Sequence, residues 1–345
     1  MTYQQPELKP QQTIHQAVPA KRAGVLLGPV LTGLVGLLAA ALVAAAPPAH
    51  AQAGLSKSVS ARLQPGDIVY ADSGDNLYGG FVIKVNPVAG QKSVLSSGGL
   101  LRLPFDVVFD AYGQIIVSDS GRLIRIDPNS GAQSLIVDNR SGLLGWPCGL
   151  AVDRRQSIVA ANLQAVVRVN PNSGYVQTVA AGGSLLYPLG VAVAASGDLL
   201  VLNMAFPAQI LRVSQNGAQT IISSGGLLNH PQAIAVSGDH IFVTDVADPG
   251  GNFGVGRVID INAATGAQSL AAEGQYLVGP VGIAVDAAGQ LVVGDPYTIN
   301  PNSPDLFDGG LIRIDPVSHQ QVLVTRGEGS FVNPRGVAIV PNTKN

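Results

Sequence analysis

The stretch PFDVVFDAYGQIIVSDSGRLIRIDPNSGAQSLIV, residues 104–137, contains four short apolar segments separated by turn residues. In its third segment, RLIRI, Arg125 lies between two isoleucines, as expected for a pleated strand whose side chains alternate between two faces. Apolar runs of this length, bounded by Gly, Pro, Asn and Asp, predict antiparallel strands joined by hairpins. The stretch is therefore predicted to form one four-stranded sheet, with strands A, B, C and D in chain order.

This pattern recurs along the chain, and each recurrence opens with a proline. The openings are Pro104, Pro147, Pro188, Pro231, Pro280 and Pro334. The first five continue through all four strands, whereas the last has strand A only and the segment before Pro104 has strands B, C and D only. Together the two incomplete pieces make a sixth unit. We predict an all-β, six-bladed β-propeller with four-stranded antiparallel blades over residues 64–341. The C-terminal strand is expected to join the N-terminal blade and close the ring.

The motif P-x-G-(V/I)-A-V-D, followed by G-x-(I/L)-x-V-x-(D/N) and R-(I/V)-(D/N)-P, resembles the NHL-repeat family of six-bladed propellers. The resemblance covers about residues 64–341. It is specific for the architecture and says little about activity, because such propellers carry unrelated functions.

The N-terminal region has a composition of its own. Lys21 and Arg22 precede an apolar run of about 24 residues, and Ala49-His50-Ala51 follows as a small-residue cleavage signal. We interpret residues 1–51 as a signal peptide of a periplasmic or secreted protein, residues 52–63 as a linker and residues 342–345 as a tail. The apolar run is also long enough to be an uncleaved N-terminal anchor, and membrane contact is expected only in that case.

Composition excludes some partners. Only 12% of residues are charged and the formal net charge is −2, with no basic run after the N-terminal region, so nucleic-acid binding is not expected. Cys148 is the only cysteine, so there is no intrachain disulfide. Its thiol is expected to be a small buried group rather than a nucleophile. We expect a monomer.

In each blade the end of strand B and the start of strand C lie on one face, with the loops that enter strand A. We call this the B–C loop face, and function is expected there because loops on a rigid scaffold carry it. The last residue of strand B is an Asp or Asn in every blade: Asp72, Asp119, Asn162, Asn203, Asp245 and Asp295. These side chains either tie down the following turn or form a ring that holds a cation such as Ca²⁺, with Asp72, Asp245 and Asp295 as the first candidate metal ligands.

The B–C loops of blades 5, 6 and 1 are long and polar, whereas the other three are short. These blades are neighbours in the ring, so their acidic and amide side chains are predicted to form an acidic crescent. Its members are Asp245, Asp248, Asn252, Asp295, Asp305, Asp308, Asp72, Asp75 and Asn76.

The residues that precede the prolines form a second candidate set. They are Leu103, Trp146, Tyr187, His230, Gly279 and Asn333. The four from blades 2 to 5, beside Met204 and Phe206, offer an apolar and aromatic arc, which either packs blade against blade or binds a ligand. Arg335 of the last strand A should lie next to Asp106. The two could form a salt bridge that closes the ring, or Arg335 could bind an anion in the channel.

Some enzymes have related propellers, and this chain lacks most of the residues that their sites require. The gluconolactonase-like group binds a cation with residues near the start of strand A, where this chain has Asp106, Gly149, Gly190, Ala233, Gly282 and Gly336. Only one of these can be a ligand. His230 should lie on the B–C loop face, but His240 and His319 on the opposite one, which argues against a zinc site built from histidines.

The sequence thus predicts an exported binding module that takes a small-molecule or protein ligand on its B–C loop face. The alternative is a cation-dependent hydrolase or lyase that uses the Asp/Asn ring. Under the first hypothesis, alanine at Asp295, Asp305 and Asp308 should abolish binding and leave the thermal transition nearly unchanged.

Overall fold

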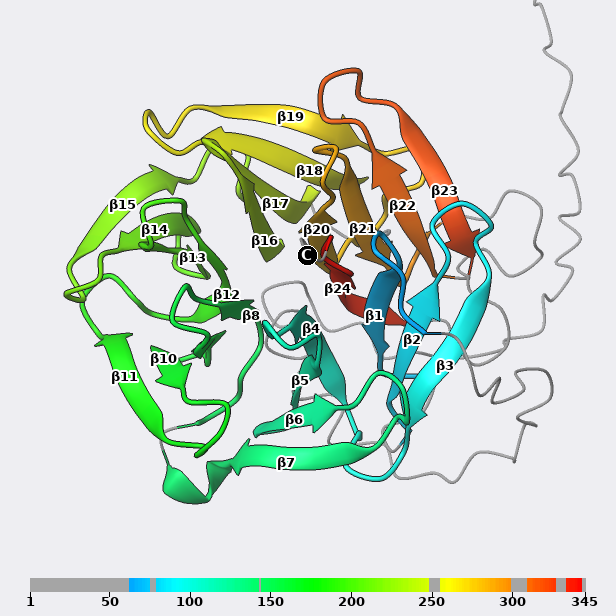
Figure 1. The fold of residues 1–345 in the computed structure, drawn as a ribbon. Helices are drawn as coiled ribbons and strands as arrows, with labels where there is room; N and C mark the ends of the chain where they lie inside the picture. The colour runs from blue at the N-terminus through cyan, green and yellow to red at the C-terminus, as the bar shows by residue number, and fades with distance from the viewer. Residues whose placement is uncertain are drawn as a thin grey trace, which may run out of the picture.

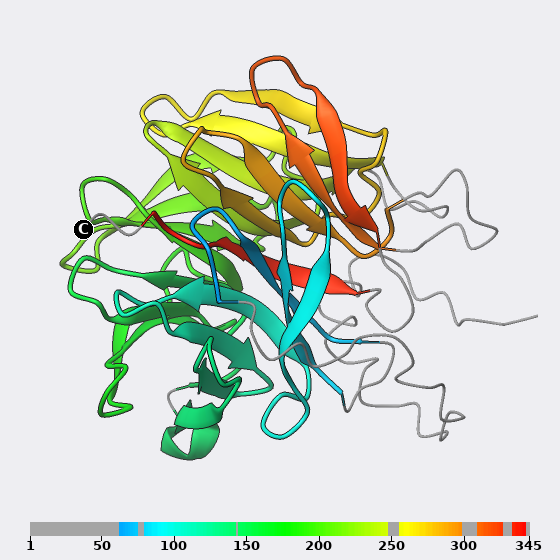
Figure 2. The ribbon, with the colours of Figure 1, turned by 45° about the vertical axis from the view of Figure 1, so that its right-hand side comes forward.

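Six four-stranded antiparallel sheets are arranged around a central axis in the computed structural model of the chain (Figure 1). The structure describes residues 62–342 except 75–78, 143, 248–254, 299–308 and 327–332. Strand β24 (Pro334–Ile339) pairs antiparallel with β1 (Ile68–Asp72), so the two ends of the chain build blade 1 together. Figure 2 shows the red β24 beside the blue β1. The predicted fold, including the closure of the ring, is confirmed.

The strands of blades 1, 2 and 3, from the channel outward, have the following bounds. Blade 1 continues from β24 and β1 with β2 (Phe81–Val85) and β3 (Lys92–Ser97). Blade 2 contains β4 (Pro104–Phe109), β5 (Ile115–Asp119), β6 (Arg122–Ile126) and β7 (Gln133–Asp138), followed by the 3-10 helix η2 (Asn139–Ser141). Blade 3 contains β8 (Leu150–Val152), β9 (Ile158–Ala161), β10 (Ala165–Val169) and β11 (Val176–Ala181).

The other three blades follow the same order. Blade 4 contains β12 (Pro188–Val193), β13 (Leu199–Asn203), β14 (Gln209–Val213) and β15 (Gln219–Ser224). Blade 5 contains β16 (Pro231–Ser237), β17 (His240–Ala247), β18 (Val255–Asn262) and β19 (Gln268–Glu273). Blade 6 contains β20 (Gly282–Val285), β21 (Leu291–Asp295), β22 (Gly310–Ile314) and β23 (Gln321–Arg326).

The core of the molecule is divided among the seams between blades. Every residue of β1, β5, β9, β13 and β21 is buried, because a second strand is covered by neighbouring blades on both of its faces. Six apolar clusters result, one at each seam, and the cluster between blades 6 and 1 includes Tyr70, Val292 and Val337. Each blade is therefore stabilised by its two neighbours.

A polar contact repeats at the outer part of the seams. Gln133 begins β7 and reaches blade 1, where its Nε2 donates to Ser96 Oγ and Gly98 O and its Oε1 accepts from Leu100 N. The same position holds Gln219, Gln268 and Gln321 in blades 4, 5 and 6. Each of them bonds the preceding blade. Blade 3 has Val176 there, so the seam between blades 2 and 3 lacks this contact.

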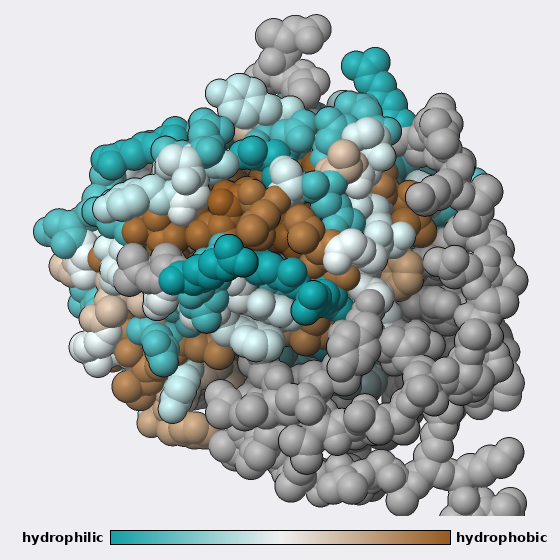
Figure 3. Space-filling model, turned by 90° about the horizontal axis from the view of Figure 1, so that it is seen from below, coloured by the Kyte–Doolittle hydropathy of each residue, from teal (hydrophilic) through white to brown (hydrophobic). Residues whose placement is uncertain are grey.

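The outer strands leave some apolar side chains at the surface. Seen from below in Figure 1, the side of the ring carries a band of apolar side chains bordered by polar ones (Figure 3). Leu135 of β7 is 46% exposed. Within the described residues no helix has the length and apolar character needed to cross a membrane.

Candidate functional site

The six Asp and Asn side chains predicted at the ends of the second strands are all buried, although Asn162 follows β9 and Asp245 lies two residues before the end of β17. In four blades the side-chain oxygen accepts hydrogen bonds from the two backbone N–H groups just before the proline of the same blade. Asp119 Oδ2, for example, accepts from Arg102 N at 2.7 Å and Leu103 N at 2.9 Å. Asn203, Asp245 and Asp295 make the equivalent bonds. The side chain thus fixes the entry of the innermost strand to the end of the second one.

The other two members of the ring tie down their own B–C turns. Asp72 Oδ1 accepts from Gly74 N at 2.7 Å, and its Oδ2 accepts from Asn333 N at 3.3 Å. Asn162 Oδ1 accepts from Gln164 N and Ala165 N. The six side chains therefore support backbone, which is the first of the two roles predicted for them.

Burial raises the pKa of several of these carboxyl groups. It raises the pKa of Asp72 and of Asp295 to about 6, although backbone N–H donors act in the opposite direction. It also raises the pKa of Asp245, which Arg257 partly offsets through a salt bridge of 3.0 Å. Over the described ranges, no three His, Cys, Asp or Glu side chains come together as metal ligands would. The candidate ligands Asp72, Asp245 and Asp295 are directed at backbone amides.

Six of the nine members of the acidic crescent lie outside the part of the chain that the structure describes. Asp75, Asp248, Asp305 and Asp308 lie outside the described residues, as do Asn76 and Asn252. The crescent stays a prediction.

The aromatic arc is divided by the structure into buried and exposed members. Leu103 is buried at 9% exposure. Tyr187 and Phe206 are 47% and 76% exposed on the B–C loop face. Leu186, which precedes Tyr187 and was not predicted, is 55% exposed, and we call these three residues the blade 4 patch. Their loops are fixed, since Asn203 accepts from the N–H groups of Leu186 and Tyr187.

Two further members of the arc are half-buried and each has an unused polar atom. Nδ1 of His230 and Nε1 of Trp146 are buried and have no hydrogen-bond partner among the described residues. His240 and His319 lie at the opposite face as predicted, where His240 bonds Asp260 and His319 Nδ1 contacts Ala271 O at 2.8 Å.

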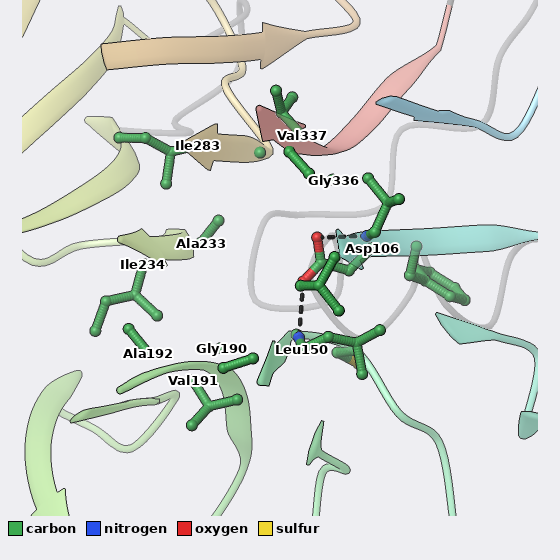
Figure 4. Close-up of a pocket in the computed structure, with 18 of the residues that line it drawn as sticks. Asp106, Leu150, Gly190, Val191, Ala192, Ala233, Ile234, Ile283, Gly336 and Val337 are labelled. Carbon is green, nitrogen blue, oxygen red and sulfur yellow. Dashed lines mark hydrogen bonds between the residues drawn. The ribbon is translucent and has the colours of Figure 1, made fainter. Parts of the chain in front are cut away.

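The channel itself forms a cavity of about 510 Å³ lined by the innermost strands of all six blades (Figure 4). Val, Leu, Ile, Ala and Gly make up most of its wall, and Asp106 and Arg335 are its only charged residues among those described. Gln232 and Cys148 add polar groups. Burial raises the pKa of the Cys148 thiol to about 12, as expected for an inert thiol.

Asp106 joins the innermost strands of blades 2 and 3. Its Oδ2 accepts from Leu150 N at 2.7 Å and its Oδ1 from Val107 N at 2.8 Å, as Figure 4 shows. Burial raises the pKa of Asp106 to about 7, despite these two donors.

The expected salt bridge between Arg335 and Asp106 is not formed. The backbone of the closing strand does contact Asp106, through Gly336, but the Arg335 side chain turns toward the channel mouth. Its guanidinium carbon lies 5.3 Å from the centre of the Phe105 ring, and its Nε donates to Ser73 Oγ at 3.1 Å. Phe105 also meets Trp146 edge to face at 5.8 Å. Desolvation lowers the pKa of Arg335.

Sequence reasoning missed Phe105 and Tyr297 at the mouth. Phe105 follows a proline, and that position reads Phe, Cys, Leu, Gln, Val and Arg around the ring, which shows no pattern. Tyr297 is 46% exposed and its ring packs on Gly279, where a Cβ would lie 2.6 Å from Cδ2. Gly279 is the one glycine among the six residues that precede the prolines. This exception was the sequence signal that another side chain packs there.

Comparisons with known proteins support the fold alone. No family model and no curated protein matches the chain. It is similar to a chain in a solved structure described as a nidogen/laminin complex, with a TM-score of 0.62 and 14% identity. The match covers 79% of this chain and 98% of that one. The neighbour is thus a propeller of the same architecture found in a protein complex.

Proposed function

We propose that the chain is an exported NHL-repeat propeller that binds a protein partner on its B–C loop face, with the blade 4 patch as the centre of contact. Export rests on the predicted signal peptide in residues 1–51, and the family on the repeat motif. The observation that carries the proposal is the exposure of Leu186, Tyr187 and Phe206 together on loops that are held by hydrogen bonds.

Rigid, exposed aromatic side chains suit protein recognition. They offer a large contact area with little conformational entropy to lose, and Tyr is enriched among residues that dominate interface energetics. The structural neighbour in the nidogen/laminin complex supports a protein-binding role for this architecture. The predicted acidic crescent would lie on the same face and add a charged rim.

The alternative, a cation-dependent hydrolase on the Asp/Asn ring, gains no support from the described side chains. Asp295 uses both carboxylate oxygens for backbone N–H groups, and Asp245 divides its oxygens between backbone and Arg257. Neither carboxylate has an oxygen free of hydrogen bonds, as a group held ready for a cation would.

The proposal is tested by selecting binding peptides from a displayed library on the purified chain. Selected peptides should bind a Tyr187→Ala/Phe206→Ala variant at least about 10-fold more weakly, since truncating interface aromatics typically costs this much or more. The matched control is Tyr112→Ala/Tyr175→Ala, which removes two tyrosines that are 81% and 69% exposed in hairpin turns of the opposite face.

Equal binding to the patch variant and the wild-type chain would contradict the proposal. So would a selection that enriches no peptide, or one whose peptides are lost only on the control variant.

A further inference from the structure

Arg335 carries an incompletely used positive charge in the wall of the channel. Its Nε is bonded to Ser73, while its two terminal nitrogens make no hydrogen bond with any described residue. No described carboxylate lies within salt-bridge distance of it. Asp72, which interacts with it electrostatically, uses its oxygens for backbone N–H groups. The two terminal nitrogens of this half-buried guanidinium can therefore donate hydrogen bonds to an anion that enters the channel.

The surroundings of Arg335 are those of a small-ligand site. A volume of about 510 Å³ falls within the usual size of such cavities, and the wall is mostly aliphatic. The guanidinium carbon lies 5.3 Å from the centre of the Phe105 ring, a cation–π contact that favours a positive charge at this place. Trp146, which meets Phe105 edge to face, has a buried Nε1–H with no hydrogen-bond partner among the described residues.

We propose that the mouth of the channel binds a small organic carboxylate, with the carboxylate on Arg335 and its apolar body inside the channel. This goes beyond protein binding at the blade 4 patch, because it uses different residues and a different class of ligand. One guanidinium fork matches one carboxylate in bidentate geometry. A phosphate dianion fits less well, since the described lining offers a single cation and also contains Asp106.

The chain supplies its own reporter for this site. Trp146 is its only tryptophan and lies one ring away from Arg335, so intrinsic fluorescence will report ligand entry. The purified chain is titrated at pH 7.5 with phenylacetate and hexanoate, with the neutral amides of both acids, and with inorganic phosphate. We expect a saturable change with the carboxylates and at least about 10-fold weaker binding of the amides and phosphate.

Three variants locate the charge that is responsible. Arg335→Gln should weaken carboxylate binding at least about 10-fold. Arg335→Lys keeps the charge but loses the planar guanidinium, so its affinity should lie between those of the wild-type chain and Arg335→Gln. Arg140→Gln is the matched control, because that side chain is 92% exposed in η2 of blade 2 and should leave binding unchanged. Tyr187→Ala/Phe206→Ala should also bind carboxylates normally, which separates this proposal from the protein-binding one.

Equal affinity for acid and amide would overturn the proposal, as would undiminished binding by Arg335→Gln or the absence of a saturable signal with every compound. If Arg335→Gln does not fold, the acid-to-amide ratio of the wild-type chain and the Arg335→Lys titration still decide it.

Discussion

Gly336 marks the point where the closing strand meets blade 2. A Cβ added there would lie 2.1 Å from Oδ1 of Asp106 and 2.4 Å from its Cα. The Cα belongs to the backbone of β4, which cannot move aside as a flexible side chain can. Gly336→Ala should therefore lower the free energy of unfolding by about 1–3 kcal/mol, the usual cost of overpacking, or by more. Thermal unfolding measures this. Gly79→Ala is the control, since its Cβ would meet nothing within 4 Å, and equal transitions for the two variants would contradict the contact.

Asp106 gives the channel a pH-dependent group. Burial raises the pKa of its carboxyl from 3.8 to about 7 in the folded chain, so the folded state holds more protons between these two pH values. The contribution of Asp106 to stability is therefore largest at low pH and falls as the pH rises from about 4 to about 7. Asn does not titrate, so the free energy of unfolding of Asp106→Asn minus that of wild type should increase by about 1–3 kcal/mol over this range.

Denaturant unfolding of both proteins at a series of pH values measures this difference. A constant difference, or one that decreases as the pH rises, would show that the carboxyl ionises normally.

The same residue shows where sequence reasoning stops. That Arg335 and Asp106 stand on adjacent strands followed from the repeat and the closure of the ring. The sequence could not predict that their side chains form no salt bridge. The position of the Arg335 side chain depends on Phe105 and Ser73, and both positions vary between the repeats.

The junction between the end of a second strand and the entry to the innermost one depends on a single carboxylate. Asp295 accepts from the N–H groups of Val278, Gly279 and Tyr297, and alanine would leave buried donors without an acceptor. Asp295→Ala should thus destabilise the fold by about 1–3 kcal/mol. This revises the expectation that such a variant keeps its thermal transition. Differential scanning calorimetry compares it with Asp239→Ala, an exposed turn residue, which should unfold like wild type.

The glutamine that begins an outer strand fastens its blade to the previous one. Gln133→Ala removes three hydrogen bonds to blade 1 and should cost about 1–3 kcal/mol. Gln177→Ala in β11 is the control, because Gln177 is exposed on the corresponding strand of blade 3. Chemical denaturation distinguishes them, and a Gln133→Ala midpoint equal to that of the control would rule out the seam contact.

Strand positions could be predicted from the sequence because each blade repeats the same alternation and the same turn residues. The hydrogen-bond partners of the recurring Asp and Asn could not be predicted, because a carboxylate at a strand end can bind a cation or accept from two amide groups. The fold decides between these two roles, because it brings the backbone N–H groups before the innermost strand within 3 Å of the carboxylate.

The ring as a whole depends on β24. A chain that ends at residue 333 would leave β1 without its inner partner and would expose Tyr70 and Ile68 of the seam with blade 6. It should lose the cooperative thermal transition and associate, as measured by near-ultraviolet circular dichroism and size-exclusion chromatography. A chain that ends at residue 342 keeps β24 and serves as the control. A monomeric, cooperatively folding 1–333 chain would show that the closing strand is dispensable.

The pairing of β24 with β1 also constrains how the protein is made. Ile68 pairs with Ile339, so almost the entire chain must leave the ribosome before the first strand of the ring receives its partner. Pairs this distant in sequence form slowly. Throughout synthesis the nascent chain carries β1 with an open edge, which can pair with a neighbouring nascent chain. A chaperone that covers this edge until release would protect the step on which the native ring depends.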